Sequence, residues 1–282
     1  MAPQEPSSTN RPTWGPDGPQ RWVRYLPSAL APECIIRLVA RPIALFLDYD
    51  GTLTPIVSDP AQATLPRATF QTLNRVVERY PVAVISGRDV EDVRRMVGIE
   101  GIYYAGSHGL DIAAPDGRRL EHEQGRRSLP ALDRAAQELD QKVRGIPGAW
   151  VERKRFAIAV HYRLVDERHL DSLEDAVQAA TRYPGLRASG GKKVWELRPA
   201  VDWDKGRALI WLLETLGLGD ETTLPVYIGD DVTDEDAFDA IRDLGLGIVV
   251  EEGNRRTGAR AALRDPAEVK AFLDHLARSA DG

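Results

Sequence analysis

The sequence predicts an α/β protein whose parallel sheet core is interrupted by a smaller α+β insert. Two apolar runs of strand length, Ile43–Leu47 and Val82–Ile85, are each followed by a segment with helical periodicity. Alternating strands and helices are typical of a parallel sheet covered on both faces, which is a Rossmann-like arrangement. The alternation breaks off between residues 115 and 199 and then resumes. We therefore expect one core domain built from two separate parts of the chain.

Local patterns predict the individual core elements. Continuous apolar runs indicate buried strands, and apolar residues spaced three or four apart indicate helices. After the first strand, the expected elements are helix Arg67–Tyr80, strand Val82–Ile85, helix Val90–Val97, strand Tyr103–Ala105, helix Gly206–Leu216, strand Pro225–Ile228, helix Glu235–Ile241 and strand Gly247–Val250. Spaced apolar residues also predict a helix within Trp22–Ala40.

The insert has a different pattern. It opens with a turn signal at Pro115–Gly117. The expected elements then are helix Leu129–Val143, strands Trp150–Glu152 and Phe156–Tyr162, helix Leu170–Thr181, and strands Leu186–Ser189 and Val194–Leu197. Two repeats of a helix followed by two strands describe a small α+β cap with an antiparallel sheet.

These elements set the expected domain limits. The first 20 residues are mostly proline and small polar residues, which bury too little to order a chain. We expect an N-terminal extension over residues 1–35 that is at least partly disordered. The core domain is expected to comprise residues 36–114 and 200–282, and the cap residues 115–199. Hinges near residues 112–118 and 199–203 would let the cap open and close.

Composition excludes several classes of protein. No apolar run approaches the roughly 20 residues that a membrane span needs, and the N-terminus lacks a signal-peptide pattern. A net charge of −6 argues against nucleic acid as the main partner. Cys34 is the only cysteine, which fits a reducing, cytoplasmic location. The segment Arg118–Arg198 is net basic within an acidic chain, which suits an anion-binding segment or simply reflects varied surface charge.

Two acidic clusters follow predicted strands. Asp48 and Asp50 come directly after Ile43–Leu47, and Gly51 permits a turn that brings them around one site. Asp230 and Asp231 follow Pro225–Ile228. Parallel α/β sheets bind ligands at the carboxyl ends of their strands. Converging carboxylates repel one another unless a cation is bound, so we expect a magnesium ion there. Surface polarity, or a helix cap formed by Asp234, is the alternative interpretation.

Two further strand and helix ends carry groups suited to an anion. Ser86 follows Val82–Ile85 and offers a hydroxyl beside a helix start, although a helix cap is equally consistent. Lys205 lies at the start of the next predicted helix, where a cation opposes the helix dipole unless an anion is near. We interpret both residues as phosphate-binding. A solvated lysine is the alternative for Lys205.

In this order, the four motifs resemble the signature motifs of haloacid dehalogenase-superfamily phosphatases. Residue by residue, the sequence of these motifs and of several further segments is similar to that of trehalose-6-phosphate phosphatases, over about residues 41–275. The segments that carry this resemblance are Asp48–Ile56, Gly106–Gly109, Val151–Lys154, His161–Arg163, Gly191–Pro199 and Gly229–Phe238. Asp111 departs from the family pattern, in which Glu is commoner, so the role of that position stays open.

The resemblance implies a function and a mechanism. A member of this family hydrolyses trehalose 6-phosphate to trehalose and phosphate, the last step of trehalose biosynthesis. By motif, Asp48 would be the nucleophile that forms an aspartyl phosphate and Asp50 the general acid and base. Mg²⁺ would be held by Asp48, the backbone carbonyl of Asp50, and Asp230. Asp231 and Asp234 would support these ligands from behind or serve as alternative ligands. Ser86 and Lys205 would bind the phosphate.

The resemblance also implies substrate-binding residues and a partner. The cap residues expected to face the sugar are Glu152, Lys154, Arg163, Lys192 and Glu196. Gly87 and Arg88 are expected to bind substrate. His108, near the junction of core and cap, is expected either to contact substrate or only to pack. His161 is ranked below Arg163. Association with trehalose-6-phosphate synthase is a further possibility, because some relatives are fused to such a domain.

Two alternatives stay open at this point. A related enzyme could act on another sugar phosphate, such as sucrose 6-phosphate or a phosphoglycerate glycoside. A catalytically silent regulatory module is a different class. The chain retains its complete set of catalytic residue types, which a silent module has no chemical need to keep.

Overall fold

The computed structural model describes residues 21–57, 62–191, 193–219, 222–251 and 253–278. The chain divides into two compact units. The first contains the residues up to Val84 and those from Lys205 onward, and the second contains Ile85–Asp204. The cap limits expected from the sequence, residues 115–199, stay a prediction.

The first unit is organised around parallel strands. They lie in the order β14 (Ala261–Leu263), β12 (Leu246–Val250), β11 (Leu224–Gly229), β2 (Ile43–Leu47) and β3 (Val82–Ile85). Every residue of β2 and β11 is buried, as expected for strands covered on both faces. Because β2 and β11 are adjacent and parallel, the residues that follow them emerge at the same edge of the sheet.

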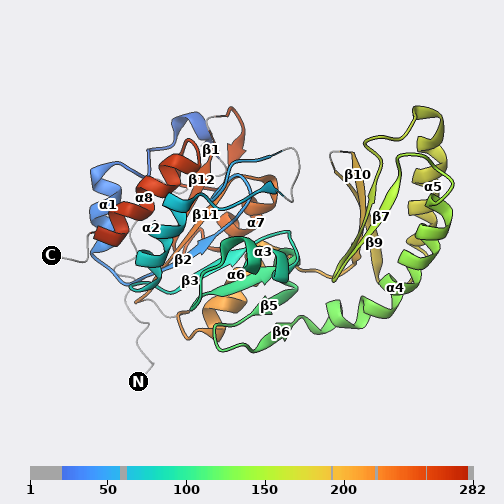
Figure 1. The fold of residues 1–282 in the computed structure, drawn as a ribbon. Coiled ribbons are helices and arrows are strands. Elements are labelled where there is room, and N and C mark those ends of the chain that lie inside the picture. The colour runs from blue at the N-terminus through green and yellow to red at the C-terminus, as the bar shows by residue number, and fades with distance from the viewer. Residues whose placement is uncertain (1–20, 58–61, 192, 220–221, 252, 279–282) are drawn as a thin grey trace, which may run out of the picture. The chain divides into compact units, whose positions relative to one another are not determined.

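Helices cover this sheet in two groups. Helix α2 (Arg67–Val77) packs on α8 (Pro266–Arg278), which also contacts α1 (Pro32–Val39). Helix α6 (Lys205–Thr215) packs on α7 (Glu235–Ala240). In Figure 1 the strands run between these two groups. The α/β core with parallel strands and an inserted α+β unit, predicted from the alternation of elements, is confirmed.

The N-terminal part of the first unit differs from the prediction. The expected helix within Trp22–Ala40 forms only as α1, because Pro27 interrupts the segment and Pro32 occupies the first turn of the helix. Upstream of it, β1 (Arg21–Trp22) pairs with β13 (Arg256–Thr257), and η1 (Val23–Tyr25) follows. Residues 1–20, where disorder is predicted, lie outside the described residues.

The second unit contains a small antiparallel meander beside helix α3 (Val90–Val97). Its strands are β4 (Tyr103–Gly106), β5 (Asp111–Ala113) and β6 (Arg119–Glu121). The turn expected at Pro115–Gly117 is confirmed, and it joins β5 to β6. Strands β5 and β6 were not predicted from the sequence, because each is only three residues long.

The rest of the second unit has one antiparallel sheet and two long helices. The strand order is β7 (Trp150–Lys154), β8 (Ala157–His161), β10 (Val194–Pro199) and β9 (Leu186–Gly191). Helices α4 (Glu123–Val143) and α5 (Leu170–Ala180) pack on one face through a buried apolar cluster that includes Leu132, Leu139, Ile158, Val160 and Leu173. Helix α4 begins before the predicted Leu129, with His122 as its N-cap. No helix among the described residues is long and apolar enough to cross a membrane.

Candidate active site

Asp48 lies at the tip of strand β2. Its backbone N–H donates to the carbonyl of Ile228 in β11 at 2.9 Å, which continues the strand pairing up to the carboxylate. The residue is 4% exposed. The loop that follows turns back at once, because Gly51 has a φ of +83° and donates to the carbonyl of Thr54 at 2.7 Å. This turn includes the half-buried Asp50.

Gly51 also makes room for the second acidic cluster. A Cβ at this position would lie 2.1 Å from Oδ2 of Asp230, at the tip of β11. The other carboxylate oxygen of Asp230 accepts a hydrogen bond from the hydroxyl of Thr52 at 3.3 Å. The close approach of the Asp48 and Asp230 loops therefore depends on a missing side chain.

Lys205 lies between two carboxylates. Its Nζ donates to Oδ1 of Asp48 at 2.8 Å and to Oδ1 of Asp234 at 2.6 Å. All three side chains are buried, with Lys205 3% exposed. A cation at the first residue of a helix opposes the helix dipole, and these two anions offset that cost. The alternative of a solvated lysine is therefore wrong.

Asp234 is held from several sides. Its Oδ1 accepts from the hydroxyl of Tyr227 at 2.5 Å in addition to Lys205, and its Oδ2 accepts from the backbone N–H of Asp231 at 2.9 Å. Asp231 is the N-cap of η5 (Val232–Asp234), where it forms a capping box with Asp234. The alternative in which Asp234 caps the following helix is wrong, because the Asp234 carboxylate makes no cap hydrogen bond to α7. The same carboxylate also positions Lys205, which a cap alone does not require.

Burial sets the protonation behaviour of the cluster. It raises the pKa of Asp48 well above its ordinary value, although Lys205 opposes this effect. Burial, with the neighbouring charge of Asp234, raises the pKa of Asp230 to about 6. For Lys205, burial favours the neutral form, but Asp48 and Asp234 outweigh it and raise the pKa. The site therefore has an excess of acidic groups over its one lysine, which attracts a further cation.

Carboxylate oxygens of Asp48, Asp230 and Asp234 lie within 4.8 Å of one another. An all-oxygen donor set of this kind suits a hard divalent ion such as Mg²⁺. Asp231 is not in this group, since its exposed carboxylate accepts from the backbone N–H of Val232 at 2.7 Å. The sequence left open which of Asp231 and Asp234 contacts the metal, and Asp234 is the one whose carboxylate lies in this group. A ligand role for Asp231 stays a prediction.

The second motif lies in the second unit, at the end of β3. Ser86 is buried, and its hydroxyl accepts from the backbone N–H of Arg88 at 3.2 Å. Its carbonyl accepts from the N–H of His108 at 2.9 Å. A Cβ on Gly87 would lie 3.0 Å from the His108 ring, so the ring lies close to that backbone. The motif Ser86–Arg88 and His108, which were predicted from separate parts of the sequence, thus lie close together.

The cap sheet presents a charged face opposite its helices. Strand register places Glu152 and Lys154 of β7 on the same face as Glu196 of β10, since Glu152 and Glu196 both pair with Ala159 of β8. Lys154 Nζ lies 3.7 Å from Oε1 of Glu196 and 3.9 Å from Oε2 of Glu152. Three of the predicted sugar-binding residues therefore form one cluster.

The other two predicted cap residues are Arg163 and Lys192. Arg163 follows the end of β8 and is exposed, and Lys192 lies outside the described residues. His161 instead belongs to the charged face, with Nε2 3.0 Å from Oε2 of Glu152. His161 was ranked below Arg163 from the sequence, yet it is the His161 imidazole that contacts Glu152 on this face. Arg198, on the same face, was also missed, and its Nε lies 3.7 Å from Oε2 of Glu196.

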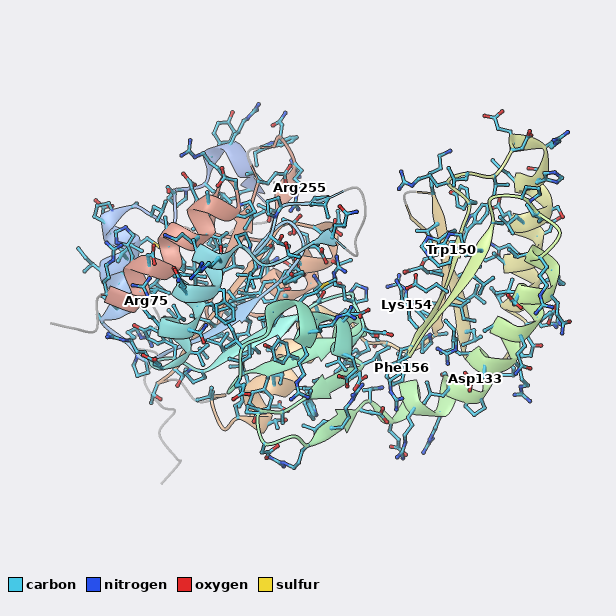
Figure 2. All side chains as sticks on the ribbon, in the orientation of Figure 1. Arg75, Asp133, Trp150, Lys154, Phe156 and Arg255 are labelled. Carbon is cyan, nitrogen blue, oxygen red and sulfur yellow. The ribbon has the colours of Figure 1, made fainter. Side chains whose placement is uncertain are left out.

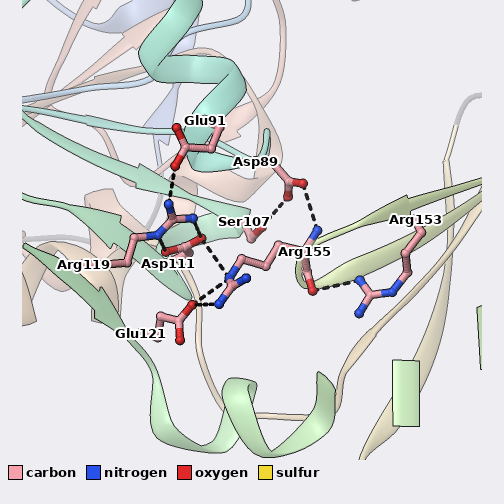
Figure 3. A network of polar contacts seen from close by, with 8 residues as sticks. All are labelled: Asp89, Glu91, Ser107, Asp111, Arg119, Glu121, Arg153 and Arg155. Atoms are coloured by element: carbon pink, nitrogen blue, oxygen red, sulfur yellow. Dashed lines mark hydrogen bonds and ion pairs between the residues drawn. The ribbon is translucent and has the colours of Figure 1, made fainter. Parts of the chain in front are cut away.

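A polar network ties the β7–β8 turn to the meander (Figure 3). The carboxylate of Asp111, 1% exposed, accepts two hydrogen bonds from Arg119 and lies 3.6 Å from Nε of Arg155. Arg155 also donates from Nε to Glu121 at 2.6 Å, and from its backbone N–H to Asp89 at 2.9 Å. The position whose role the sequence left open is thus an ion-pair centre.

Comparison with known proteins identifies the family. The trehalose-phosphatase family model matches residues 46–267. The chain belongs to that family. A trehalose-phosphate phosphatase of Mycobacterium tuberculosis (strain ATCC 25618 / H37Rv) is 46% identical over 245 residues, which are 86% of this chain and 63% of that protein. The chain thus spans less than two thirds of the length of such relatives.

Solved structures of this family have the same fold. A trehalose-6-phosphate phosphatase related protein superposes with a TM-score of 0.72 at 28% identity, covering 83% of this chain and 96% of its own. The C-terminal domain of trehalose-6-phosphate phosphatase from C. albicans gives a TM-score of 0.71 at 24% identity, covering 90% and 98%. At 24% identity, the similarity to the C. albicans domain supports the fold alone. The trehalose-phosphatase resemblance inferred from the motifs is confirmed.

Proposed function

We propose that the protein hydrolyses trehalose 6-phosphate to trehalose and phosphate through an aspartyl-phosphate intermediate, as the last step of trehalose biosynthesis. The observation that carries this proposal is the buried Asp48 carboxylate, hydrogen-bonded to Lys205 beside Asp230, in a trehalose-phosphatase family chain. Relatives named trehalose-phosphate phosphatase support the substrate.

In the proposed first step, Asp48 attacks phosphorus in line with the sugar oxygen. A bond forms between phosphorus and Oδ2 of Asp48, because Lys205 already binds Oδ1. The bond between phosphorus and the sugar oxygen breaks at the same time. Asp50 donates its proton to that oxygen, so trehalose leaves as a neutral alcohol.

The second step regenerates the enzyme. Asp50, now ionised, takes a proton from a water molecule that attacks phosphorus. The bond between phosphorus and Asp48 breaks, which releases inorganic phosphate and restores the carboxylate. Ser86 and Lys205 hold the phosphate oxygens in both steps, and Gly87, Arg88 and His108 line the phosphate side of the substrate.

The residues proposed to hold Mg²⁺ are Asp48, Asp50 through its carbonyl, and Asp230, with Asp234 or Asp231 beside them. The ion, when bound, neutralises charge between carboxylate and phosphate. The hydrogen bonds that Asp234 already accepts suit it to positioning Lys205 more than to direct ligation.

We assign sugar recognition to the charged face of the cap sheet. Glu152, Lys154 and Glu196 would form charge-assisted hydrogen bonds with sugar hydroxyls, and Arg163 and Lys192 are proposed to add to them. Other sugar phosphates, such as sucrose 6-phosphate, remain the competing substrates. A cytoplasmic location and an association with trehalose-6-phosphate synthase stay predictions.

The test is phosphate release from trehalose 6-phosphate, sucrose 6-phosphate, glucose 6-phosphate and fructose 6-phosphate, with Mg²⁺ and after chelation. We expect release from trehalose 6-phosphate at least about a hundredfold faster than from the others, which corresponds to a few kcal/mol of selective binding. Activity should disappear with EDTA and return with added Mg²⁺. Equal rates on all four esters would reject the substrate, and no release from any of them would reject the phosphatase.

A further inference from the structure

An exposed aromatic pair lies at one end of the charged face. Trp150 and His161 are directly opposite in the pairing of β7 with β8, and their rings stack with centroids 3.7 Å apart and an angle of 6° between planes. Trp150 is 53% exposed. One face of its indole lies on His161, so the other face and the edges contribute the exposed area.

The pair is held in place by its neighbours. His161 Nε2 lies 3.0 Å from Oε2 of Glu152, which restricts rotation of the imidazole, and the imidazole supports the indole. The apolar side of the same sheet is already covered by α4 and α5. Packing of the sheet therefore does not account for a large, rigid and exposed ring on the charged side. Exposed rings with fixed polar groups beside them are typical of ligand sites.

The spacing of the groups matches an elongated polar ligand. Trp150 and Lys154 are four residues apart in β7, which is roughly 13 Å along a strand. This span is comparable to two linked pyranose rings. A pyranose offers hydroxyls at its rim and an apolar C–H surface on its face. The charged cluster around Lys154 can hydrogen-bond to the hydroxyls, and the indole of Trp150 can stack on the C–H face (Figure 2).

We propose that the Trp150–His161 pair is a stacking platform for one pyranose ring of a disaccharide phosphate. The other ring binds at the charged cluster of Glu152, Lys154 and Glu196. This assignment rests on the proposed function and deepens it, because a platform of this kind favours disaccharide phosphates over monosaccharide phosphates. Trp150 is then a specificity-determining residue for which the catalytic motifs give no signal.

The kinetic test compares Trp150→Ala and Trp150→Phe with the unaltered chain. The readout is the ratio of kcat/KM for trehalose 6-phosphate to kcat/KM for glucose 6-phosphate, which has no second sugar ring. We expect Trp150→Ala to lower this ratio about tenfold, mainly through KM, and Trp150→Phe to lower it less than about threefold. Trp22→Ala removes a tryptophan from β1 of the first unit and should leave the ratio unchanged.

A binding measurement separates this inference from the proposed function. Trehalose is titrated calorimetrically into the Asp48→Asn protein and into the same protein with Trp150→Phe or Trp150→Ala. Weaker binding with Ala than with Phe supports the platform even if the phosphatase assay fails. Equal ratios and equal trehalose affinities for Trp150→Ala and the unaltered residue would overturn it. A loss with Phe as large as with Ala would also overturn it, since a ring would still be present.

Discussion

The ammonium group of Lys205 donates a 2.8 Å hydrogen bond to Oδ1 of Asp48, a residue 157 positions away in the chain. Asp234 binds the same ammonium at 2.6 Å. In the proposed chemistry, this hydrogen bond occupies Oδ1 of Asp48, and Oδ2 is the oxygen that attacks phosphorus. It also places the Lys205 ammonium where the proposal puts the phosphate oxygens, so it links folding of the site to the proposed chemistry.

Replacement of Asp48 by Asn tests the nucleophile. The amide keeps the shape of the carboxylate and its oxygen can still accept from Lys205, but it cannot form an acyl phosphate. We expect turnover of trehalose 6-phosphate to fall by about a thousandfold or more. Because burial already disfavours the charged form of Asp48, the thermal midpoint should change little. Phosphate release within tenfold of the unaltered enzyme would remove Asp48 from its proposed role.

Gly51→Ala tests whether the missing side chain at this turn shapes the metal site. A Cβ there would meet Oδ2 of Asp230 at 2.1 Å, so the carboxylate must move. We expect the Mg²⁺ concentration for half-maximal activity to rise about tenfold or more. Gly117→Ala is the matched control, because Gly117 has the same φ of +83° but nothing within 4 Å of the added atom.

Both glycine variants lose about 1 kcal/mol from backbone strain. The Mg²⁺ requirement should therefore separate them where thermal stability does not. An equal Mg²⁺ dependence in Gly51→Ala and Gly117→Ala would show that Asp230 does not depend on the close approach at Gly51.

Asp111→Asn tests the ion-pair centre beneath the β7–β8 turn. The substitution leaves Arg119 and Arg155 without the buried carboxylate between them. We expect a loss of about 1 to 3 kcal/mol in the free energy of unfolding, measured by urea denaturation. Arg118→Ala, which removes the exposed ion pair with Asp116, should leave it nearly unchanged, because solvent screens that pair. A loss no larger than that of Arg118→Ala would show that the network is not a stability element.

The pH dependence of stability should reveal the contribution of the ionised Glu138 carboxylate. Hydrogen bonds from Lys142 and Arg182 lower the pKa of its carboxyl to about 2 in the folded protein, against about 4.3 in the unfolded chain. Its contribution is therefore complete above about pH 5 and declines as the pH falls from there toward 2. Glu138→Gln should cost about 1 kcal/mol at pH 7.

At pH 3 the free energy of unfolding of Glu138→Gln should differ less from that of the unaltered protein. At that pH the Glu138 carboxyl is largely protonated in the unfolded chain, and this removes stability from the unaltered protein. Urea denaturation at pH 7, 5, 4 and 3 checks this. A difference that stays constant over that range would show that ionisation of Glu138 is not what stabilises the α4–α5 pair.

Much of the core could be predicted from the sequence because its signals are local. The bounds of the apolar runs Ile43–Leu47 and Val82–Ile85 are the same as those of β2 and β3. Helical spacing located α3 at Val90–Val97. Short elements could not be predicted, since β5 and β6 have three residues each and their pairing depends on neighbours. Helix α8 was also missed, although it packs against α2 in the core.

The sequence by itself determined which residues follow which strands, and hence the approximate position of the acidic clusters, because a parallel sheet places all its strand ends at one edge. Only the tertiary structure decided that Asp234 rather than Asp231 approaches Asp48 and Lys205, and that Trp150 stacks on His161 beside Glu152. These contacts depend on strand register and on side-chain direction. Neither the register nor the side-chain direction can be predicted from the spacing of residues along the chain.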